Sequence, residues 1–455
     1  MLPWQHAITS AGGCLYEVGG CVRDRFLGRA GKDRDYLVTG LPLEHLGAVL
    51  KAFGAVAWVG KAFGVLKFSP HQSPETVHDI ALPRTETSTG VGHRDFAVTF
   101  DHALPVETDL GRRDFTINAM AWDLTADRCI DPFNGRADLE RRLIRQVFPA
   151  AFEEDPLRLL RAIQFAARFD LTIEPETAAA MRRHAALLGT VSGERIVEEI
   201  RKLLLAKRPS VGFYRMAELD ILPHCFPELA ACIGVAQDKM KDDDVFGHTM
   251  RVLDAARADP ELLAPGDLHL LFAALYHDVG KPKTRRFDPA VGRITFYGHQ
   301  LVSKRICAKR LHDLKAATIG LDALRVCRLV ELHMFETKAH FTDKAIRRFI
   351  QKVGPDLILT LLDLRLADNR GGKYPGGIKG ALRLRKRIRE ELDRKPPFGP
   401  KDLAINGHDL IAMGIAAGPK MGQVLHQLVE LCLDDPAMNE RERLLALARG
   451  MHEGL

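Results

Sequence analysis

The run GGCVRD at residues 19–24, followed by DRD at residues 33–35, constrains the fold of this chain more than any other feature. A glycine pair after a short apolar run predicts a strand that ends in a tight turn. Backbone N–H groups can approach a phosphate at such a turn, and Arg23 would add a forked cationic contact. If a strand follows, Asp33 and Asp35 point to one of its faces, since side chains alternate along a strand. Paired carboxylates beside a phosphate-binding turn suit two Mg²⁺ ions in phosphoryl transfer, although a lone D-x-D run is more often a solvated loop.

A second basic motif, RRDFTINAMA, begins at Arg112. Arg112 and Arg113 precede an apolar, helix-like segment and would neutralise the charge of a triphosphate. Asp114 would accept a hydrogen bond from a ribose hydroxyl. The alternative is a surface arginine pair in which Asp114 caps a helix.

The length of 455 residues predicts about two to four domains. A hydrophobic fraction of 46% with 27% charged residues is typical of a soluble globular protein. The eight cysteines include no C-x-x-C pair, and no run of 18 apolar residues or leader-like start occurs. We therefore expect a cytoplasmic protein with reduced thiols and no membrane partner.

Positive charge is concentrated in two blocks, although the net charge is only +6. Residues 279–315 carry ten Lys and Arg against two acids, and residues 379–395 carry eight against three. Such blocks favour a polyanionic partner, and the alternative is a solvated helix face.

Five motifs occur in an order that resembles one family, the bacterial class II tRNA nucleotidyltransferases, which include CCA-adding enzymes and poly(A) polymerase relatives. They read GGCVRD, DRD, RRDFTINAMA, DPFNGRADLERRLIR and EDPLRLLRAIQFAARF. The resemblance implies an α/β, polymerase-beta-like nucleotidyltransferase head with a small mixed sheet, followed by all-α neck, HD and tail domains. We place these domains at residues 1–148, 149–235, 236–375 and 376–455.

The resemblance also implies roles for residues of the head. Asp33 and Asp35 match the family's magnesium-binding carboxylates, and Gly20, Arg23 and Arg112 match positions that hold the incoming nucleotide. In the chemistry implied, the RNA 3′-hydroxyl attacks the α-phosphorus of CTP or ATP and pyrophosphate leaves.

The stretch EDPLRLLR at residues 154–161 predicts the start of a helix, because acids and proline mark the first turn. At about 100° per residue, Asp155, Arg158 and Arg161 would share one exposed arc. The resemblance assigns base reading to Asp155 and Arg158, with Arg161 supporting the nucleotide. The generic alternative is a solvated ion pair, and Gln164 departs from relatives that have a further arginine there.

A different site is predicted around the dipeptide His277-Asp278, at an exposed helix end before Gly280 and Pro282. Imidazole and carboxylate ligands favour a divalent transition metal over magnesium. With His248 upstream and Asp368 downstream, the set resembles the HD phosphohydrolase superfamily. The nearby residues His299 and His333 are candidates for a second metal or a phosphate contact, with core or surface roles as the alternative.

The combined expectation is an enzyme that adds C and A to the tRNA 3′ end, binding the acceptor end and elbow through phosphates and A-form shape. A-only addition and poly(A) synthesis remain open as alternatives. From another class, the alternative is a metal-dependent phosphohydrolase that acts on RNA ends and uses the head only to bind RNA.

Overall fold

The computed structural model describes residues 1–29, 34–59, 64–88, 96–237, 243–337, 341–372 and 377–453; for residues 86–88, 96–98, 452 and 453 it describes the backbone alone. The chain divides into two compact units, Met1–Pro227 and Glu228–Leu455. In these ranges, no helix is both long enough and apolar enough to span a membrane.

A mixed seven-stranded sheet organises the N-terminal unit, with the strand order β3-β4-β5-β2-β1-β8-β9. Its strands are β1 (Cys14–Val18), β2 (Asp35–Thr39), β3 (Gly54–Val59), β4 (Val65–Pro70), β5 (His78–Ala81), β8 (Ala121–Asp123) and β9 (Arg128–Ile130). All neighbouring strands are antiparallel except β2 and β5, which run parallel. A separate hairpin joins β6 (Arg84–Ser88) to β7 (Phe96–Phe100). The predicted small mixed sheet is confirmed.

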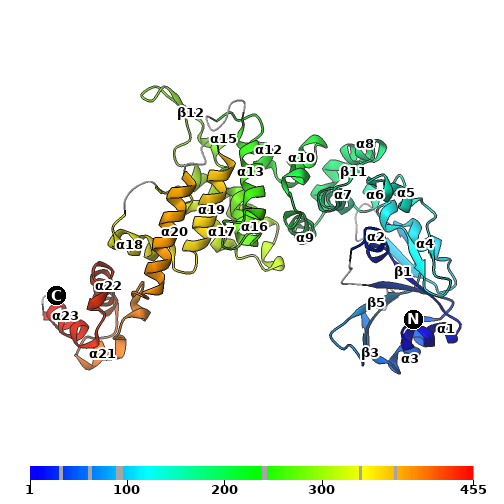
Figure 1. Cartoon of the computed structure of the whole chain (residues 1–455), viewed down its shortest axis with the longest axis horizontal. Helices are drawn as coiled ribbons and strands as arrows, with labels where there is room; N and C mark the ends of the chain where they lie inside the picture. The colour runs from blue at the N-terminus through cyan, green and yellow to red at the C-terminus, as the bar shows by residue number, and fades with distance from the viewer. Residues whose placement is uncertain are drawn as a thin grey trace. The chain divides into compact units, whose positions relative to one another are not determined.

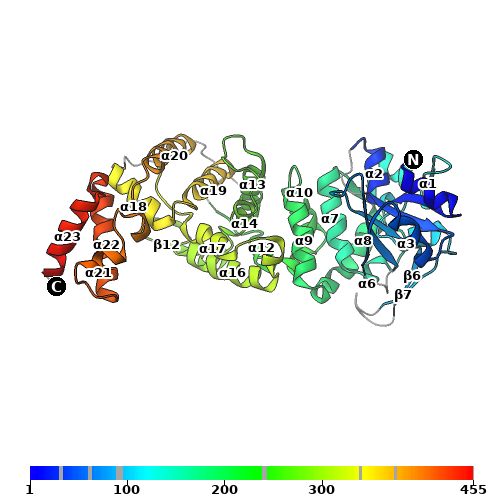
Figure 2. The ribbon, with the colours of Figure 1, turned by 90° about the horizontal axis from the view of Figure 1, so that it is seen from below.

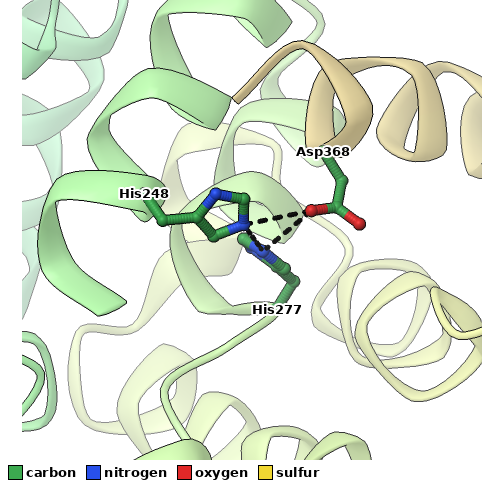
Figure 3. A group of neighbouring side chains, drawn as sticks. All are labelled: His248, His277 and Asp368. Atoms are coloured by element: carbon green, nitrogen blue, oxygen red, sulfur yellow. Dashed lines mark hydrogen bonds and ion pairs between the residues drawn. The ribbon is translucent and has the colours of Figure 1, made fainter. Parts of the chain in front are cut away.

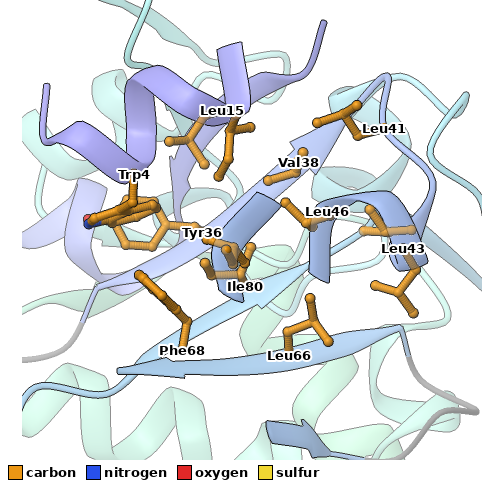
Figure 4. Packing of buried hydrophobic residues seen from close by; sticks show 13 residues of the cluster. Trp4, Leu15, Tyr36, Val38, Leu41, Leu43, Leu46, Leu66, Phe68 and Ile80 are labelled. Carbon is orange, nitrogen blue, oxygen red and sulfur yellow. The ribbon is translucent and has the colours of Figure 1, made fainter. Parts of the chain in front are cut away.

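The two faces of this sheet carry different cores, because side chains alternate along each strand. On one face, Tyr36 and Val38 pack with residues of α1 (Pro3–Ser10) and α3 (Leu43–Lys51), as Figure 4 shows. On the other face, Leu37 packs with residues of β1 and of α4 (Val106–Gly111). The second face therefore carries α4 and the RRD motif that follows it.

Helices follow the sheet in the same unit. They are α5 (Gly135–Glu140), α6 (Ala151–Glu154), α7 (Leu157–Phe169), α8 (Pro175–His184), α9 (Gly193–Leu204), α10 (Ser210–Glu218), α11 (Leu222–Cys225) and α12 (Pro227–Ala230), the last of which crosses the unit boundary. The helix predicted to start near residue 154 is displaced. Its proline, Pro156, is the N-cap of α7, and Asp155 before it has extended backbone dihedral angles. Asp155 is therefore not part of α7.

Among its described residues, the C-terminal unit is mainly helical and has one small hairpin, β12 (Arg286–Asp288) with β13 (Arg293–Thr295). Its first helices are α13 (Val245–Ala258), α14 (Leu268–Tyr276), α15 (Lys281–Thr284), α16 (His299–Asp313), α17 (Ala323–Leu332), α18 (Asp343–Val353) and α19 (Ile358–Gly371). Helices α13, α14 and α19 pack against one another, as do α16 and α17 (Figures 1 and 2).

The tail of this unit forms its own hydrophobic core. Its helices are α20 (Gly377–Asp393), α21 (Gly407–Ala412), α22 (Pro419–Asp434) and α23 (Arg441–Glu453). The second basic block, residues 379–395, lies mostly within α20, which packs on α19. Buried Arg347 of α18 joins the tail to the preceding helices, because its guanidinium contacts Glu391 of α20 and the Leu433 carbonyl of α22.

Candidate active sites

The glycine turn lies where the sequence predicts it, at the end of β1. Gly19 has a positive φ of 75° and caps α2 (Gly20–Phe26). A Cβ added at Gly19 would lie 2.5 Å from Nη1 of Arg113, so the turn and the RRD motif are in direct contact. Only glycine suits this position, because the backbone is left-handed and the space is already filled.

Of the two predicted metal-binding carboxylates, Asp33 lies outside the described residues and Asp35 is the exposed first residue of β2. In the parallel pair of β2 and β5, Asp35 is in register with Asp79. By alternation, Asp35 shares the sheet face of Leu37, which is the face that carries α4. Asp79 is about half exposed, and Lys67 lies 3.5 Å from it.

Asp79 is a candidate that the sequence analysis missed. Its only sequence signal is a carboxylate within a short apolar run, which does not indicate which strand lies beside it. The register of a parallel pair between β2 and β5, which are separated by β3 and β4 in the chain, exists only in the folded sheet.

Arg112 and Arg113 are held by one buried carboxylate, that of Asp109 in α4. Arg112 Nη2 lies 2.6 Å from Asp109 Oδ1, and Arg113 Nη2 lies 3.0 Å from Oδ2. Burial alone would raise the pKa of Asp109, but Arg113 and Arg112 lower it below its usual range. Nε of Arg113 is buried and has no hydrogen-bond partner. The pair is thus preorganised, with about a fifth of each side chain exposed.

Asp114 is an internal hub rather than an open acceptor. Its Oδ1 accepts hydrogen bonds from the backbone N–H of Phe115 and from Nδ2 of Asn118, and its Oδ2 accepts one from Nε of Arg161 at 2.7 Å. Burial would raise the pKa of Asp114, but Arg161 and these hydrogen bonds lower it. The Asp114 carboxylate thus accepts three hydrogen bonds from within the chain. Its contact with a ribose hydroxyl stays a prediction.

Arg23 is buried instead of extending into a phosphate site. Its Nη1 donates to Oδ1 of Asn118 at 2.8 Å, and its Nη2 lies 2.7 Å from Asp24. The guanidinium carbon lies 4.3 Å from the ring centroid of Phe169 in α7. Arg23, Asn118 and Asp114 therefore form a continuous polar network that links α2 to α7.

The predicted exposed arc of Asp155, Arg158 and Arg161 is wrong. Asp155 pairs with Arg195 of α9 at 2.8 Å, whereas Arg161 pairs with Asp114. Arg158 is buried, and it donates to the carbonyls of Ala151 and Arg112. The reason is the late start of α7, which removes Asp155 from the helix on which the angular argument depends. Arg195 is a further residue that the sequence analysis did not single out.

The C-terminal unit brings its predicted ligands together into two adjoining clusters of histidine and aspartate. His248, His277 and Asp368 form the first, shown in Figure 3, and Asp278, His299 and His333 form the second. Within each cluster the ligand atoms lie within 4.8 Å of one another. The expected exposure of His277 and Asp278 is wrong, since both are buried beneath the surrounding helices.

Asp278 joins the two clusters. Its Oδ2 lies 3.1 Å from Nε2 of His277, and its Oδ1 lies 3.2 Å from Nε2 of His299. The ammonium group of Lys281 is 2.7 Å from the same Oδ2. One carboxylate therefore offers an oxygen atom to each cluster.

The tautomers of the four histidines are fixed by backbone carbonyls. Nδ1 of each ring contacts a backbone carbonyl oxygen at 2.7–3.2 Å. The pairs are His248 with Gly371, His277 with Ala274, His299 with Phe296 and His333 with Val330. A carbonyl only accepts, so Nδ1 carries the proton and Nε2 keeps its lone pair. Burial and nearby His277 lower the pKa of His333 to about 3, which keeps this ring neutral.

These lone pairs face each other across short distances. Nε2 of His248 lies 3.4 Å from Nε2 of His277, and Nε2 of His299 lies 3.3 Å from Nε2 of His333. Two opposed lone pairs repel, whereas a cation bound to both nitrogen atoms removes the repulsion. The donor set of neutral imidazoles and carboxylates therefore fits a divalent transition metal at each cluster.

Comparisons with known proteins cover both units. Four family models match in sequence: the Poly A polymerase head domain at residues 15–145, the RNA and SrmB-binding site of polymerase A at 170–233, the HD domain at 245–370, and tRNA nucleotidyltransferase domain 2 at 378–448. The order agrees with the resemblance described from the motifs.

Among curated proteins, the chain is 37% identical over 379 residues to the "Multifunctional CCA protein" of Xylella fastidiosa (strain 9a5c), covering 80% of this chain and 86% of that one. It is 34% identical over 436 residues to the protein of the same name from Xanthomonas campestris pv. campestris (strain B100), covering 90% and 96%. Among solved structures, it matches the Bacillus stearothermophilus CCA-adding enzyme in complex with CTP, with a TM-score of 0.68, 26% identity and coverage of 100% and 99%. The Thermotoga maritima CCA-adding enzyme complexed with tRNA, at 23% identity and a TM-score of 0.57, shares the fold.

Proposed function

The chain belongs to the family of the multifunctional CCA proteins, and from this we propose that it adds C and A to the tRNA 3′ end from CTP and ATP, with release of pyrophosphate. It is a template-independent nucleotidyltransferase, and its substrates are tRNA and the two nucleoside triphosphates. The names of its relatives support CCA addition over A-only addition or poly(A) synthesis.

The observation that carries the proposal is the register of Asp35 with Asp79 on the sheet face that also carries the RRD motif. We propose that Asp33, Asp35 and Asp79 hold divalent metal at this edge, with Mg²⁺ as the ion, because hard carboxylate oxygens are its preferred ligands. The metal, when bound, activates the RNA 3′-hydroxyl and stabilises charge on the phosphates. The support is that Asp35 begins β2 and Asp79 lies beside it in β5. Asp35 is exposed and 47% of the Asp79 side chain is exposed.

We propose that the chain's own basic groups position the triphosphate. Arg112 and Arg113 are fixed by Asp109, so both guanidinium groups are oriented before the nucleotide arrives. The backbone at Gly20 contributes N–H donors beside them. Arg23 holds Asn118, and thereby the turn of the RRD motif, in place.

Base selection is proposed for the region between α6, α7 and α9. Asp155 and Arg161 keep 24% and 33% of their side chains exposed, which leaves edges for hydrogen bonds to a base. Arg158 donates to the carbonyl of Arg112, so we propose that it couples base reading to the triphosphate-binding arginines.

The test uses tRNAs that lack one, two or three terminal nucleotides, with CTP and ATP supplied separately and together. We expect restoration of the missing nucleotides and then termination. Incorporation of ATP with rejection of CTP would overturn CCA addition in favour of A-only addition. Extension of unstructured RNA well beyond three adenosines would overturn it in favour of poly(A) synthesis.

We propose a second activity, metal-dependent phosphohydrolysis, for the C-terminal unit. The supporting observation is that Asp278 offers one oxygen to each of two histidine clusters whose Nε2 lone pairs converge. A terminal or 2′,3′-cyclic phosphate at a damaged tRNA end is the proposed substrate, because its removal provides the 3′-hydroxyl that the head requires. Divalent transition metals should restore hydrolysis of p-nitrophenyl phosphate by chelator-treated protein; absence of hydrolysis with every such metal would overturn this activity.

We also propose the four domain boundaries given above. The basic helix α20 is proposed to contact the acceptor end and the elbow of tRNA. Support for tRNA binding by the tail is the basic composition of residues 379–395 within a helix. A cytoplasmic location is proposed with them, supported by the eight cysteines, all of which are free thiols.

A further inference from the structure

We propose that Tyr297 stacks on the base of the terminal nucleotide whose phosphate is held at the two histidine clusters, so that this site selects nucleotides over simple phosphate esters. The inference rests on the phosphohydrolase activity proposed above and assigns a residue that determines its specificity.

Tyr297 is the most exposed aromatic residue of the C-terminal unit among those described. Its exposed fraction is 72%, although its ring is a large apolar surface. It lines a cavity of about 620 Å³ together with Asp278, His299 and His333. This volume lies in the range of sites that bind small ligands, which is about 300–1,000 Å³. The exposed ring and the ligand atoms of the second cluster therefore belong to one cavity.

The backbone around Tyr297 is tied directly to the second cluster. The carbonyl of Phe296 accepts hydrogen bonds from both the backbone N–H and Nδ1 of His299, at 3.1 Å and 2.8 Å. Gly298, which lies between them, has a positive φ of 75° and is the N-cap of α16. The backbone that carries Tyr297 is thus fixed relative to His299, and Tyr297 lines the cavity beside it.

The charges around the cavity suit a nucleotide phosphate. Exposed Arg293 of β13 and buried Lys281 line the cavity with Tyr297. The surrounding stretch, residues 279–315, has ten basic residues and two acids. An aromatic platform combined with cationic groups is the chemistry that recognises single-stranded nucleic acid without choosing among bases, since every base presents a π-face.

The β12–β13 hairpin, which precedes Tyr297 in the chain, provides a matched control. Phe287 of β12 is 66% exposed and aromatic, but it does not line the cavity. If the base stacks on Tyr297, only the substitution of Tyr297 should weaken nucleotide binding. If exposed aromatic residues bind nucleotides non-specifically, substitution of either residue should weaken it.

The experiment measures binding of the slowly hydrolysed 3′-phosphorothioates of adenosine, uridine and base-free methyl riboside to the full chain loaded with Zn²⁺, by calorimetry, because the carboxylates and imidazole lone pairs of the clusters would hold a phosphate only through the metal. The wild-type chain should bind both nucleotides about 10-fold more tightly than the base-free ester. Tyr297→Ala should remove this preference, while Tyr297→Phe and Phe287→Ala should keep it. Any nucleotide binding at the head is the same in all variants, so differences report on the cavity.

With metal added, Tyr297→Ala should raise KM for nucleoside 2′,3′-cyclic phosphates about 10-fold and leave kcat nearly unchanged. Equal binding of nucleotides by wild type and Tyr297→Ala, or equal binding of nucleotide and base-free ester by wild type, overturns the inference. Failure of the metal-loaded wild type to hydrolyse p-nitrophenyl phosphate overturns the phosphohydrolase proposal instead, and the base preference in binding still decides the role of Tyr297.

Discussion

At the scale of single residues, Asp278 is the side chain that connects the two histidine clusters. Its two oxygens contact different histidine clusters, and Lys281 balances its charge. A buried carboxylate is stable only with such partners. The Lys281 ammonium group lies 2.7 Å from Asp278 Oδ2, so a metal ion that binds this oxygen would compete with the ammonium group.

The number of metal ions bound is the first prediction. We expect chelator-treated wild-type chain to bind two divalent transition-metal ions at the C-terminal unit, and His299→Ala to bind one, because only the second cluster loses a ligand. Calorimetric titration with Zn²⁺ and elemental analysis would measure the stoichiometry. His312→Ala is the matched control, since this histidine lies on the same helix α16 and its side chain is 91% exposed. One ion in wild type, or two in His299→Ala, would contradict the prediction.

The second prediction at this scale concerns the loss of activity when Asp79 is substituted. Asp79→Asn should lower kcat for CMP and AMP incorporation by at least about 100-fold, because a neutral amide supports a metal ion poorly. Incorporation of labelled nucleotide into tRNA lacking its terminal adenosine would measure the effect. Glu44→Gln, at an exposed position of α3, should retain wild-type activity. Wild-type kcat in Asp79→Asn would remove this residue from the proposed metal site.

At the scale of elements, α7 connects the two candidate parts of the head reaction. Its Arg161 pairs with Asp114, its Arg158 donates to the carbonyl of Arg112, and its Phe169 lies under Arg23. A movement of this helix would therefore shift the arginines proposed to bind the triphosphate together with the region proposed to read the base.

The pH dependence of stability is the third prediction and belongs to the contact between α7 and the RRD motif. Arg161 holds the pKa of Asp114 low in the folded chain despite burial, so the stabilisation is complete above the usual carboxyl range near 4 and is lost as the pH falls through the folded value. Thermal unfolding of Asp114→Asn should show a lower midpoint than wild type at pH 7. The difference should shrink toward pH 3.

The control for this prediction is Asp123→Asn, because Asp123 caps a surface turn through the N–H groups of Thr125 and Ala126. It should shift the midpoint much less at pH 7. A difference between Asp114→Asn and wild type that grows toward pH 3 would have the opposite sign and would contradict the assignment.

At the scale of the whole molecule, the two proposed activities belong to two different compact units. The carboxylates, arginines and α7 lie within Met1–Pro227, whereas both histidine clusters lie within Glu228–Leu455. Each site is complete within its own unit, so a substitution in one should leave the chemistry of the other intact.

Separation of the two activities is the fourth prediction. On tRNA that ends in a 2′,3′-cyclic phosphate, His277→Ala should block CCA addition, because the terminus is never opened. The same variant should add CCA normally to tRNA with a free 3′-hydroxyl. Asp35→Ala should do the reverse, opening the cyclic phosphate without adding nucleotides. Gel analysis of defined tRNA ends would measure both steps, and loss of nucleotide addition to open ends in His277→Ala would contradict the separation.

Several features of the site could be predicted from local sequence, and others could not. The turn at Gly19 and the strand before it follow from residue type and order. The grouping of His248, His277 and Asp368 is expected from the resemblance to the HD superfamily. The exposed arc of Asp155, Arg158 and Arg161 failed because a shift in the start of α7 moved Asp155 off the helix. A helical projection is only as accurate as the helix boundary it assumes.

The sequence by itself determined the family, the order of the domains and the kinds of side chain available for chemistry, because motifs are local and turns require particular residues. Only the tertiary structure decided that Asp79 lies beside Asp35, that Arg23 and Arg158 are buried, and that Asp278 bridges two clusters. The physical reason is that strand register, burial and the convergence of lone pairs depend on segments distant in the chain, and these meet only when the cores on each face of the sheet and between the helices are packed.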